Sequence, residues 1–157
     1  MSLRYSGMPS HLAAAYRAGA PDANGQVPER HVSVSGGEPC RHCLGVVAAG
    51  EAYLILGYRP FPAPQPYAEI GPVFLHAEAC PAYPPTHGLP EREQRGSGRI
   101  LRGYGADHRI VYGTGRVVAN DGIEAAAAEI LARDDVAYIH MRSAAYNCFT
   151  LRIDEAT

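Results

Sequence analysis

The stretch Glu51-Ala52-Tyr53-Leu54-Ile55-Leu56-Gly57-Tyr58 is the clearest strand in the sequence. It is apolar on both faces, which favours a central position in a sheet. Residues 59–66 follow directly and contain four prolines. Because proline cannot donate to a sheet ladder and breaks a helix, this segment predicts a surface loop that ends the strand.

The sequence predicts short helices and strands on both sides of this strand. Residues 10–16 are expected to form a helix with Ser10 as N-cap and Gly19 as its stop. A second helix is expected over residues 122–132, where Asp121 and Glu124 have capping-box spacing. Further strands are predicted at residues 31–35, 73–76, 99–104, 108–112, 117–119, 136–141 and 148–153. The last two form a hairpin. Helices at the edges of a mostly antiparallel sheet predict an α+β fold.

The composition is that of one globular domain covering residues 1–157, with 46% hydrophobic and 19% charged residues. The net charge is -2 and no basic run stands out, so we expect no binding to nucleic acid. No targeting signal and no apolar run long enough for a membrane span are present, and a cytoplasmic location is expected. The four cysteines should then be mostly reduced, which favours metal or catalytic use over disulfides.

Two pairs of metal-ligating residues lie on either side of the central strand. Cys40 and Cys43 form a C-x-x-C pair, and His76 and Cys80 form an H-x-x-x-C pair. Two such pairs on two short turns are typical of structural zinc, held by three thiolates and one imidazole. The competing interpretation is that these are ordinary buried cysteines and a hydrogen-bonded core histidine.

Two enzymatic alternatives use the same residues. A dithiol redox site at Cys40 and Cys43 would need a helix opening after a strand, and no convincing helix follows. A zinc deaminase carries H-x-E and P-C-x-x-C signatures. The chain contains His76-Ala77-Glu78 and Pro39 before Cys40, but in reversed order and without the expected helices.

A series of short motifs runs in order over nearly the whole chain: Pro39-Cys40-Arg41-His42-Cys43-Leu44, Gly50-Glu51, Pro66-Tyr67, Gly71-Pro72-Val73-Phe74, Arg102-Gly103-Tyr104, Val136-Ala137-Tyr138-Ile139-His140 and Asn147-Cys148-Phe149. With this series the chain resembles the bacterial domain-of-unknown-function family 1203. The resemblance implies a small stand-alone bacterial protein with no assigned activity. In that family positions like Cys43, His76 and Cys80 vary, which implies that a metal is not a common property of the family and leaves it open as a property of this member. Glycine is more usual than Asn147.

A second candidate site is independent of metal and comprises Cys40, Arg41, Tyr67, Glu69 and His140. We expect these residues to line one cleft for a small anionic ligand, because arginine beside a titratable histidine favours carboxylate or phosphate. The alternative is an Arg41–Glu69 ion pair and a core hydrogen bond at His140. The sequence therefore predicts a binding or interaction domain, with a small enzyme or anion-binding protein as the alternative. No feature indicates a particular protein partner.

Overall fold

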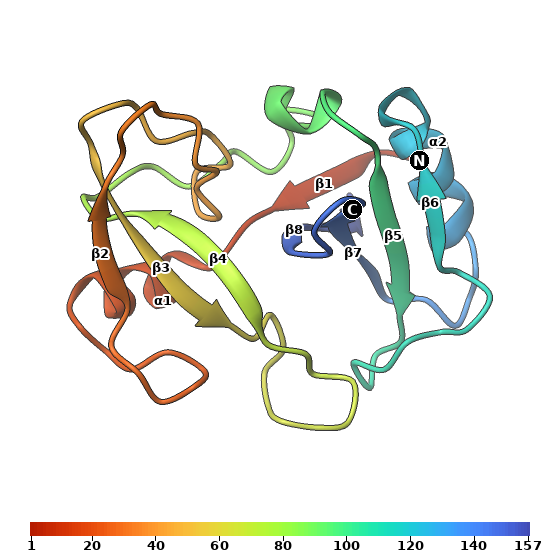
Figure 1. The fold of residues 1–157 in the computed structure, drawn as a ribbon. Helices are drawn as coiled ribbons and strands as arrows, with labels where there is room; N and C mark the ends of the chain where they lie inside the picture. Colours follow the sequence, from red (N-terminus) through yellow and green to blue (C-terminus); the bar gives the residue numbers. More distant parts are fainter. The chain divides into compact units, whose positions relative to one another are not determined.

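The structure is a computed structural model that describes residues 1–157. It contains two α-helices and two antiparallel sheets, of five and three strands, and it confirms the predicted α+β class. The chain forms two compact units (Figure 1). Unit 1 comprises residues 1–6, 61–68 and 84–157, and unit 2 comprises residues 7–60 and 69–83. The prediction of one domain stays a prediction, because compact units of one chain need not fold independently.

Unit 2 is built on a three-stranded sheet in the order β2–β3–β4. These strands are β2 (Glu29–Val32), β3 (Ala52–Tyr58) and β4 (Gly71–His76). The predicted strand at residues 51–58 is therefore present, and its central position is confirmed. Its side chains alternate between half-buried and fully buried, so that Leu54 and Leu56 face the core together with Leu75 of β4.

Helix α1 (Ser10–Arg17) also belongs to unit 2 and confirms the predicted first helix. The N-cap prediction is wrong: Pro9 holds that position, and no side chain caps the helix. Ser10 lies in the first turn, and its Oγ is instead 2.8 Å from Nε2 of His42. Gly19 follows the helix with φ of 93°, a left-handed conformation that glycine adopts without strain. The expected stop is confirmed.

Unit 1 contains the five-stranded sheet in the order β1–β8–β7–β5–β6. Its strands are β1 (Leu3–Ser6), β5 (Arg99–Tyr104), β6 (Arg116–Val118), β7 (Tyr138–Ser143) and β8 (Phe149–Glu155). The predicted hairpin of the last two strands is confirmed by the antiparallel pairing of β7 with β8. Two short 3-10 helices, η1 (Glu91–Gln94) and η2 (Asn120–Gly122), flank β5 and β6 in the sequence.

Two local predictions for unit 1 are wrong. Residues 108–112 form no strand, and only an isolated bridge links Ile110 to Tyr104. His108 has φ of 63°, and a left-handed residue interrupts an extended segment. Helix α2 (Ile123–Leu131) is present as predicted, but the Asp121 capping box is not, because Asp121 lies in η2 and no side chain caps α2.

The two faces of the five-stranded sheet differ. One face packs against α2: a Cβ added at Gly103 of β5 would lie 3.0 Å from Ile130 of α2, and Ile139, Met141 and Leu151 are fully buried. On the opposite face, the β5–β7 register sets Tyr104 beside Tyr138 and Arg102 beside His140. Phe61 packs there, with its ring centroid 5.3 Å from that of Tyr104. The apolar face forms the core of unit 1, and the opposite face carries the polar and aromatic groups.

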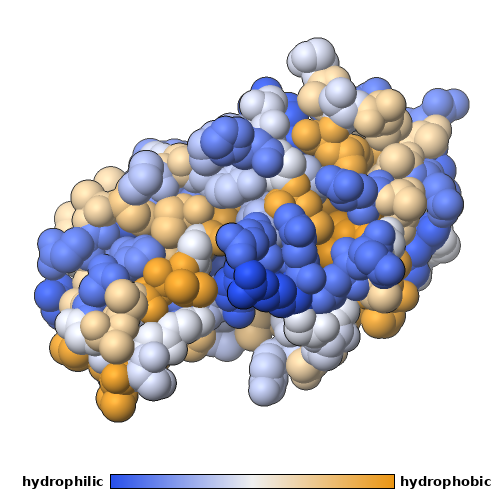
Figure 2. Space-filling view, turned by 90° about the horizontal axis from the view of Figure 1, so that it is seen from above, coloured by the Kyte–Doolittle hydropathy of each residue, from blue (hydrophilic) through white to orange (hydrophobic).

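The exposed surface mixes residue types. On the face drawn in Figure 2, hydrophobic residues form several separate groups among hydrophilic ones. Large exposed apolar side chains, such as Val34, Val117 and Tyr146, lie far apart in the sequence. Single exposed apolar side chains are normal for a folded protein. Neither α-helix has the length and apolar character that crossing a bilayer would require.

Candidate metal centre

The four predicted ligands come together in unit 2. One ligating atom each from Cys40, Cys43, His76 and Cys80 lies within 4.8 Å of all the others. The Sγ atoms of Cys40 and Cys80 are 3.8 Å apart, and Sγ of Cys43 is 3.5 Å from Nδ1 of His76. Cys40 is buried and the other three are half-buried. The two sequence pairs therefore converge into one group that could hold a metal ion.

A tight turn presents the two cysteines of the first pair. The amide of Leu44 donates to the carbonyl of Cys40 at 3.0 Å, and the amide of Cys40 donates to the carbonyl of Gly45 at 2.9 Å. Leu44 takes a left-handed φ of 58°, which closes the turn. Because the turn is this compact, both sulfurs point to the same side of the chain. No helix begins here, although the dithiol alternative needs one.

The second pair stands at the end of β4. His76 is the last residue of that strand, and its amide lies 3.4 Å from Sγ of Cys40. An isolated parallel bridge between Cys40 and Phe74 holds the turn beside the strand. Cys80 follows four residues later without intervening helix. His76 is held in place by the sheet, and Cys40 by its bridge to the same strand. Strand β4 therefore carries His76 and also positions the Cys40–Cys43 turn beside it.

Two further side chains contact Cys80, and no sequence pattern indicated either as part of the site. Arg17 of α1 donates to Sγ of Cys80 at 3.0 Å and to the carbonyl of His76 at 2.9 Å. Nδ1 of His42 is 3.2 Å from the same sulfur, while its Nε2 is 2.8 Å from Ser10 Oγ. If the serine hydroxyl donates to Nε2, then Nδ1–H donates to the sulfur. Cys80 is thereby surrounded by two donors suited to a thiolate.

The segment before α1 packs closely on the cysteine turn. The Met8 amide donates to the Arg41 carbonyl at 2.6 Å. A Cβ added at Gly7 would lie only 2.2 Å from that carbonyl oxygen, so only glycine fits. This contact links the turn to the start of α1, which carries Ser10 and Arg17. Gly7 is a structural requirement that no sequence pattern indicated.

The electrostatics of the group favour one negative sulfur. A hydrogen bond from Cys43 and the amide of His76 hold the pKa of the Cys40 thiol far below its ordinary range, at about 3. The same hydrogen bond, together with burial, raises the pKa of Cys43, and burial raises the pKa of Cys80. Burial and the nearby Arg17 charge lower the pKa of His42, which keeps that imidazole neutral. A cation placed among the sulfurs would favour thiolates at all three cysteines.

The second predicted set does not lie in a single unit. Cys40, Arg41 and Glu69 belong to unit 2, whereas Tyr67 and His140 belong to unit 1. The common cleft for these five residues therefore stays a prediction. Within unit 1, the Tyr67 ring contacts the guanidinium of Arg109, 5.6 Å from its centroid.

His140 is fully buried, as the core alternative expects, but its Nδ1 has no hydrogen-bond partner.

The deaminase alternative lacks its structural context. His76 ends a strand and no helix carries Glu78. The Glu78 side chain is 83% exposed and pairs with Arg30 at 3.5 Å, so it does not point into the cysteine group. A general acid or base of that chemistry has to reach the reacting atoms.

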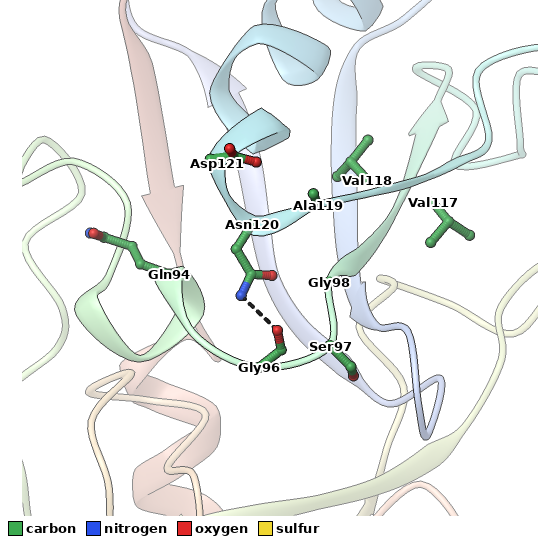
Figure 3. Close-up of a pocket in the computed structure, with 9 residues that line it drawn as sticks. All are labelled: Gln94, Gly96, Ser97, Gly98, Val117, Val118, Ala119, Asn120 and Asp121. Carbon is green, nitrogen blue, oxygen red and sulfur yellow. Dashed lines mark hydrogen bonds between the residues drawn. The ribbon is translucent and has the colours of Figure 1, made fainter.

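An open hollow in unit 1 is the other surface feature of note. It is lined by Gln94, by the Gly96-Ser97-Gly98 turn and by residues 117–121. Figure 3 shows the Asn120 side chain directed at Gly96, to whose carbonyl it donates at 3.0 Å. Its lining side chains are small, apolar or amide groups, with one carboxylate, Asp121. The Asn120 contact holds the turn in place, and the hollow contains no cluster of ligating or nucleophilic groups.

Fold and site together define a small α+β protein with a group of three cysteines and one histidine that could hold a metal ion. A family model described as "Protein of unknown function (DUF1203)" matches residues 37–155. The chain therefore belongs to this family, as the sequence resemblance predicted. No curated protein and no solved structure matches the chain significantly.

Proposed function

We propose that this protein is a non-catalytic binding or interaction domain whose unit 2 is stabilised by a structural zinc ion. The ligands are Cys40, Cys43, His76 and Cys80. The observation that carries the proposal is their convergence from two distant turns onto one point. Four protein ligands complete a tetrahedron and leave no open position, which is the arrangement of structural rather than catalytic zinc.

The separations fit a tetrahedral zinc ion. With Zn–S bonds of about 2.3 Å, the S–S edge of a regular tetrahedron is about 3.8 Å. With a Zn–N bond of about 2.05 Å, the S–N edge is about 3.6 Å. The Cys40–Cys80 separation is 3.8 Å and the Cys43–His76 separation is 3.5 Å. These two separations therefore match two opposite edges of a tetrahedron of three sulfur atoms and one nitrogen atom around zinc.

The surrounding charges also support zinc. Three thiolates, one neutral imidazole and one divalent cation carry a net charge of about -1. The Arg17 guanidinium beside Cys80 compensates this charge, and His42 adds a neutral donor to the same sulfur. Donors of this kind orient ligands and raise metal affinity. None of the four cysteines forms a disulfide, which fits the reducing cytoplasm of a bacterium as the proposed location.

Elemental analysis of the purified full chain tests the proposal. We expect about one zinc per chain, and cobalt substitution should give the visible absorption of a tetrahedral thiolate complex. Cys43→Ser should lose the metal and lower the melting temperature, because binding free energy contributes to folding. Cys148→Ser is the matched control, since this half-buried cysteine lies in unit 1 and outside the group.

Three results distinguish the proposal from a group of reduced thiols. A strong chelator should lower the melting temperature of the wild type, and added zinc should restore it. The same chelator should not affect Cys43→Ser. Protein that contains no zinc after purification, binds none on titration and has the same melting temperature with and without chelator would contradict the proposal.

A further inference from the structure

The proposed zinc module makes no use of a buried histidine in unit 1. His140 lies at the centre of four aromatic rings, with centroid separations of 4.9 Å to Phe61, 4.8 Å to Tyr104, 5.1 Å to Tyr138 and 4.9 Å to Phe149. Its side chain is only 2% exposed. A polar ring this deeply enclosed by apolar groups requires a partner or a function.

Two polar atoms in this cluster are buried without a hydrogen-bond partner. They are Nδ1 of His140 and the hydroxyl oxygen of Tyr104. Leaving a buried polar group unsatisfied destabilises the folded state, so native proteins rarely contain two such atoms in neighbouring rings. Both atoms can donate a hydrogen bond, since the imidazole can carry its proton on Nδ1. The pair therefore matches an acceptor.

Positive charge surrounds the same place. The strand register sets Arg102 of β5 and Arg152 of β8 directly opposite His140, on either side of it. Arg142 lies two residues along β7 and thus on the same face. Asp154 accepts a hydrogen bond from Arg152 at 2.6 Å, and its carboxylate partly offsets the positive charge of that arginine. The remaining field is still positive: these three arginines and His108, after burial, all lower the pKa of His140.

We infer that this face of the five-stranded sheet binds a small oxyanion, a carboxylate or a phosphoryl group. The His140 imidazole and the Tyr104 hydroxyl donate to its oxygens, and Arg102, Arg142 and Arg152 supply the opposing charge. An oxyanion accepts several hydrogen bonds at once, and guanidinium groups are the preferred protein partners of carboxylate and phosphate. The site lies within unit 1 and is independent of the zinc module.

The arginines also have a structural role, which the test must separate from ligand binding. Arg142 donates to the carbonyl of Asn147 at 3.0 Å, and Arg102 is 3.5 Å from its side-chain oxygen. Asn147 forms the β7–β8 turn with φ of 59°. Both arginines therefore hold this turn. Arg102 is half-buried and its contact with Asn147 is long, at 3.5 Å, so its replacement by glutamine should keep the fold while it removes a positive charge from the site.

The experiment is a titration of the full chain with inorganic phosphate and, separately, with acetate at constant ionic strength. The imidazole nitrogen signals of His140 are followed by NMR. We expect a saturable shift in at least one titration, and the arm with the lower Kd identifies the phosphoryl or the carboxylate class. Arg102→Gln should raise that Kd about tenfold, as expected from the loss of a charged hydrogen bond.

Arg116→Gln is the matched control. Arg116 lies on β6 of the same unit, and its guanidinium pairs with Glu129 at 2.8 Å. The Kd of the Arg116→Gln variant for the same anion should stay within about twofold of the wild-type value. His140→Phe keeps an aromatic ring in the cluster and should abolish the binding, as judged by the loss of anion-dependent protection against thermal unfolding.

The inference is overturned if the His140 signals do not shift at concentrations up to about 20 mM of either anion, where even millimolar binding saturates. Equal weakening by Arg102→Gln and Arg116→Gln would also overturn it, since that indicates only screening by salt.

Discussion

The guanidinium of Arg17 donates to the Sγ of Cys80 at 3.0 Å, across 63 positions of sequence. The contact joins the last turn of α1 to the end of the metal-ligating group. The same side chain donates to the carbonyl of His76, so it fixes two of the four proposed ligands at once. An arginine so placed both orients the ligands and balances their charge.

Replacement of this arginine should weaken metal binding. We expect Arg17→Gln to reduce zinc affinity by about 10–100-fold, the usual effect of losing a partner that orients a ligand. Competition with a chromogenic chelator measures this. Arg30→Gln is the control, because Arg30 makes an exposed ion pair with Glu78 at 3.5 Å and should leave the affinity unchanged. Equal affinities in the wild type and Arg17→Gln would refute a supporting role for Arg17.

Gly7 should tolerate no side chain. In Gly7→Ala the new Cβ would lie 2.2 Å from the carbonyl oxygen of Arg41. Because this oxygen belongs to the backbone, no side-chain rotation can relieve the overlap. The segment before α1 must then move off the cysteine turn, with a loss of about 1–3 kcal/mol in the free energy of unfolding. Urea denaturation measures it.

Gly115→Ala is the control for this substitution. Nothing lies within 4 Å of a Cβ built at Gly115, so its stability should change by no more than about 0.5 kcal/mol. If the two alanine variants had the same urea midpoint, close packing at Gly7 would not matter for the fold.

Local sequence patterns predicted much of this fold and part of the site. The apolar run at residues 51–58 and the C-x-x-C and H-x-x-x-C spacings are local features, and each is present where expected. Strand β1 was missed because it has four residues, of which only Tyr5 is buried, so no period is visible. Arg17 and His42 were missed for a different reason: their contacts with Cys80 depend on the packing of α1 and of the cysteine turn beside β4.

The false strand at residues 108–112 has a comparable cause. The segment ends in Ile110, Val111 and Tyr112, which favour strands, but the left-handed His108 and the side chains around it decide the outcome. His108 Nδ1 is 2.9 Å from the Tyr138 hydroxyl, a partner 30 positions away. Tertiary contacts of this kind override local propensity, and a single sequence does not reveal them.

A buried ion pair in unit 1 should be important for stability. Nε of Arg99 donates to Oε2 of Glu93 at 2.7 Å, and the two side chains are 7% and 2% exposed. Glu93→Gln leaves the arginine charge buried without its counter-charge. We expect the free energy of unfolding to fall by about 3–5 kcal/mol. Chemical denaturation followed by circular dichroism measures the loss.

A neighbouring exposed pair provides the comparison. Arg95 and Glu91 form an ion pair one helical turn apart, and both side chains are at least 75% exposed. Solvent screens such a pair, so Glu91→Gln should change stability by less than about 0.5 kcal/mol. A small and equal effect of both substitutions would mean that Glu93 is replaceable and that the buried pair does not hold η1 against β5.

Acid should destabilise the folded protein through His140. Burial and then the charges of Arg142, Arg152, His108 and Arg102 hold the pKa of His140 well below its ordinary value. In the unfolded chain this histidine takes up a proton near pH 6.5, whereas the folded protein does not until the pH is much lower. The unfolded state then binds more protons, so the free energy of unfolding falls as the pH drops below about 6.5, by up to about 1.4 kcal/mol per pH unit from this one group.

In His140→Phe that contribution disappears, and the free energy of unfolding should change less steeply between about pH 6.5 and pH 5. Urea denaturation of both proteins at several pH values, in buffers without phosphate or carboxylate, gives the two slopes. Because His42 and the other histidines are present in both proteins, the difference between the slopes reports His140 alone. Parallel slopes would mean that His140 takes up its proton in the folded protein as readily as in the unfolded chain.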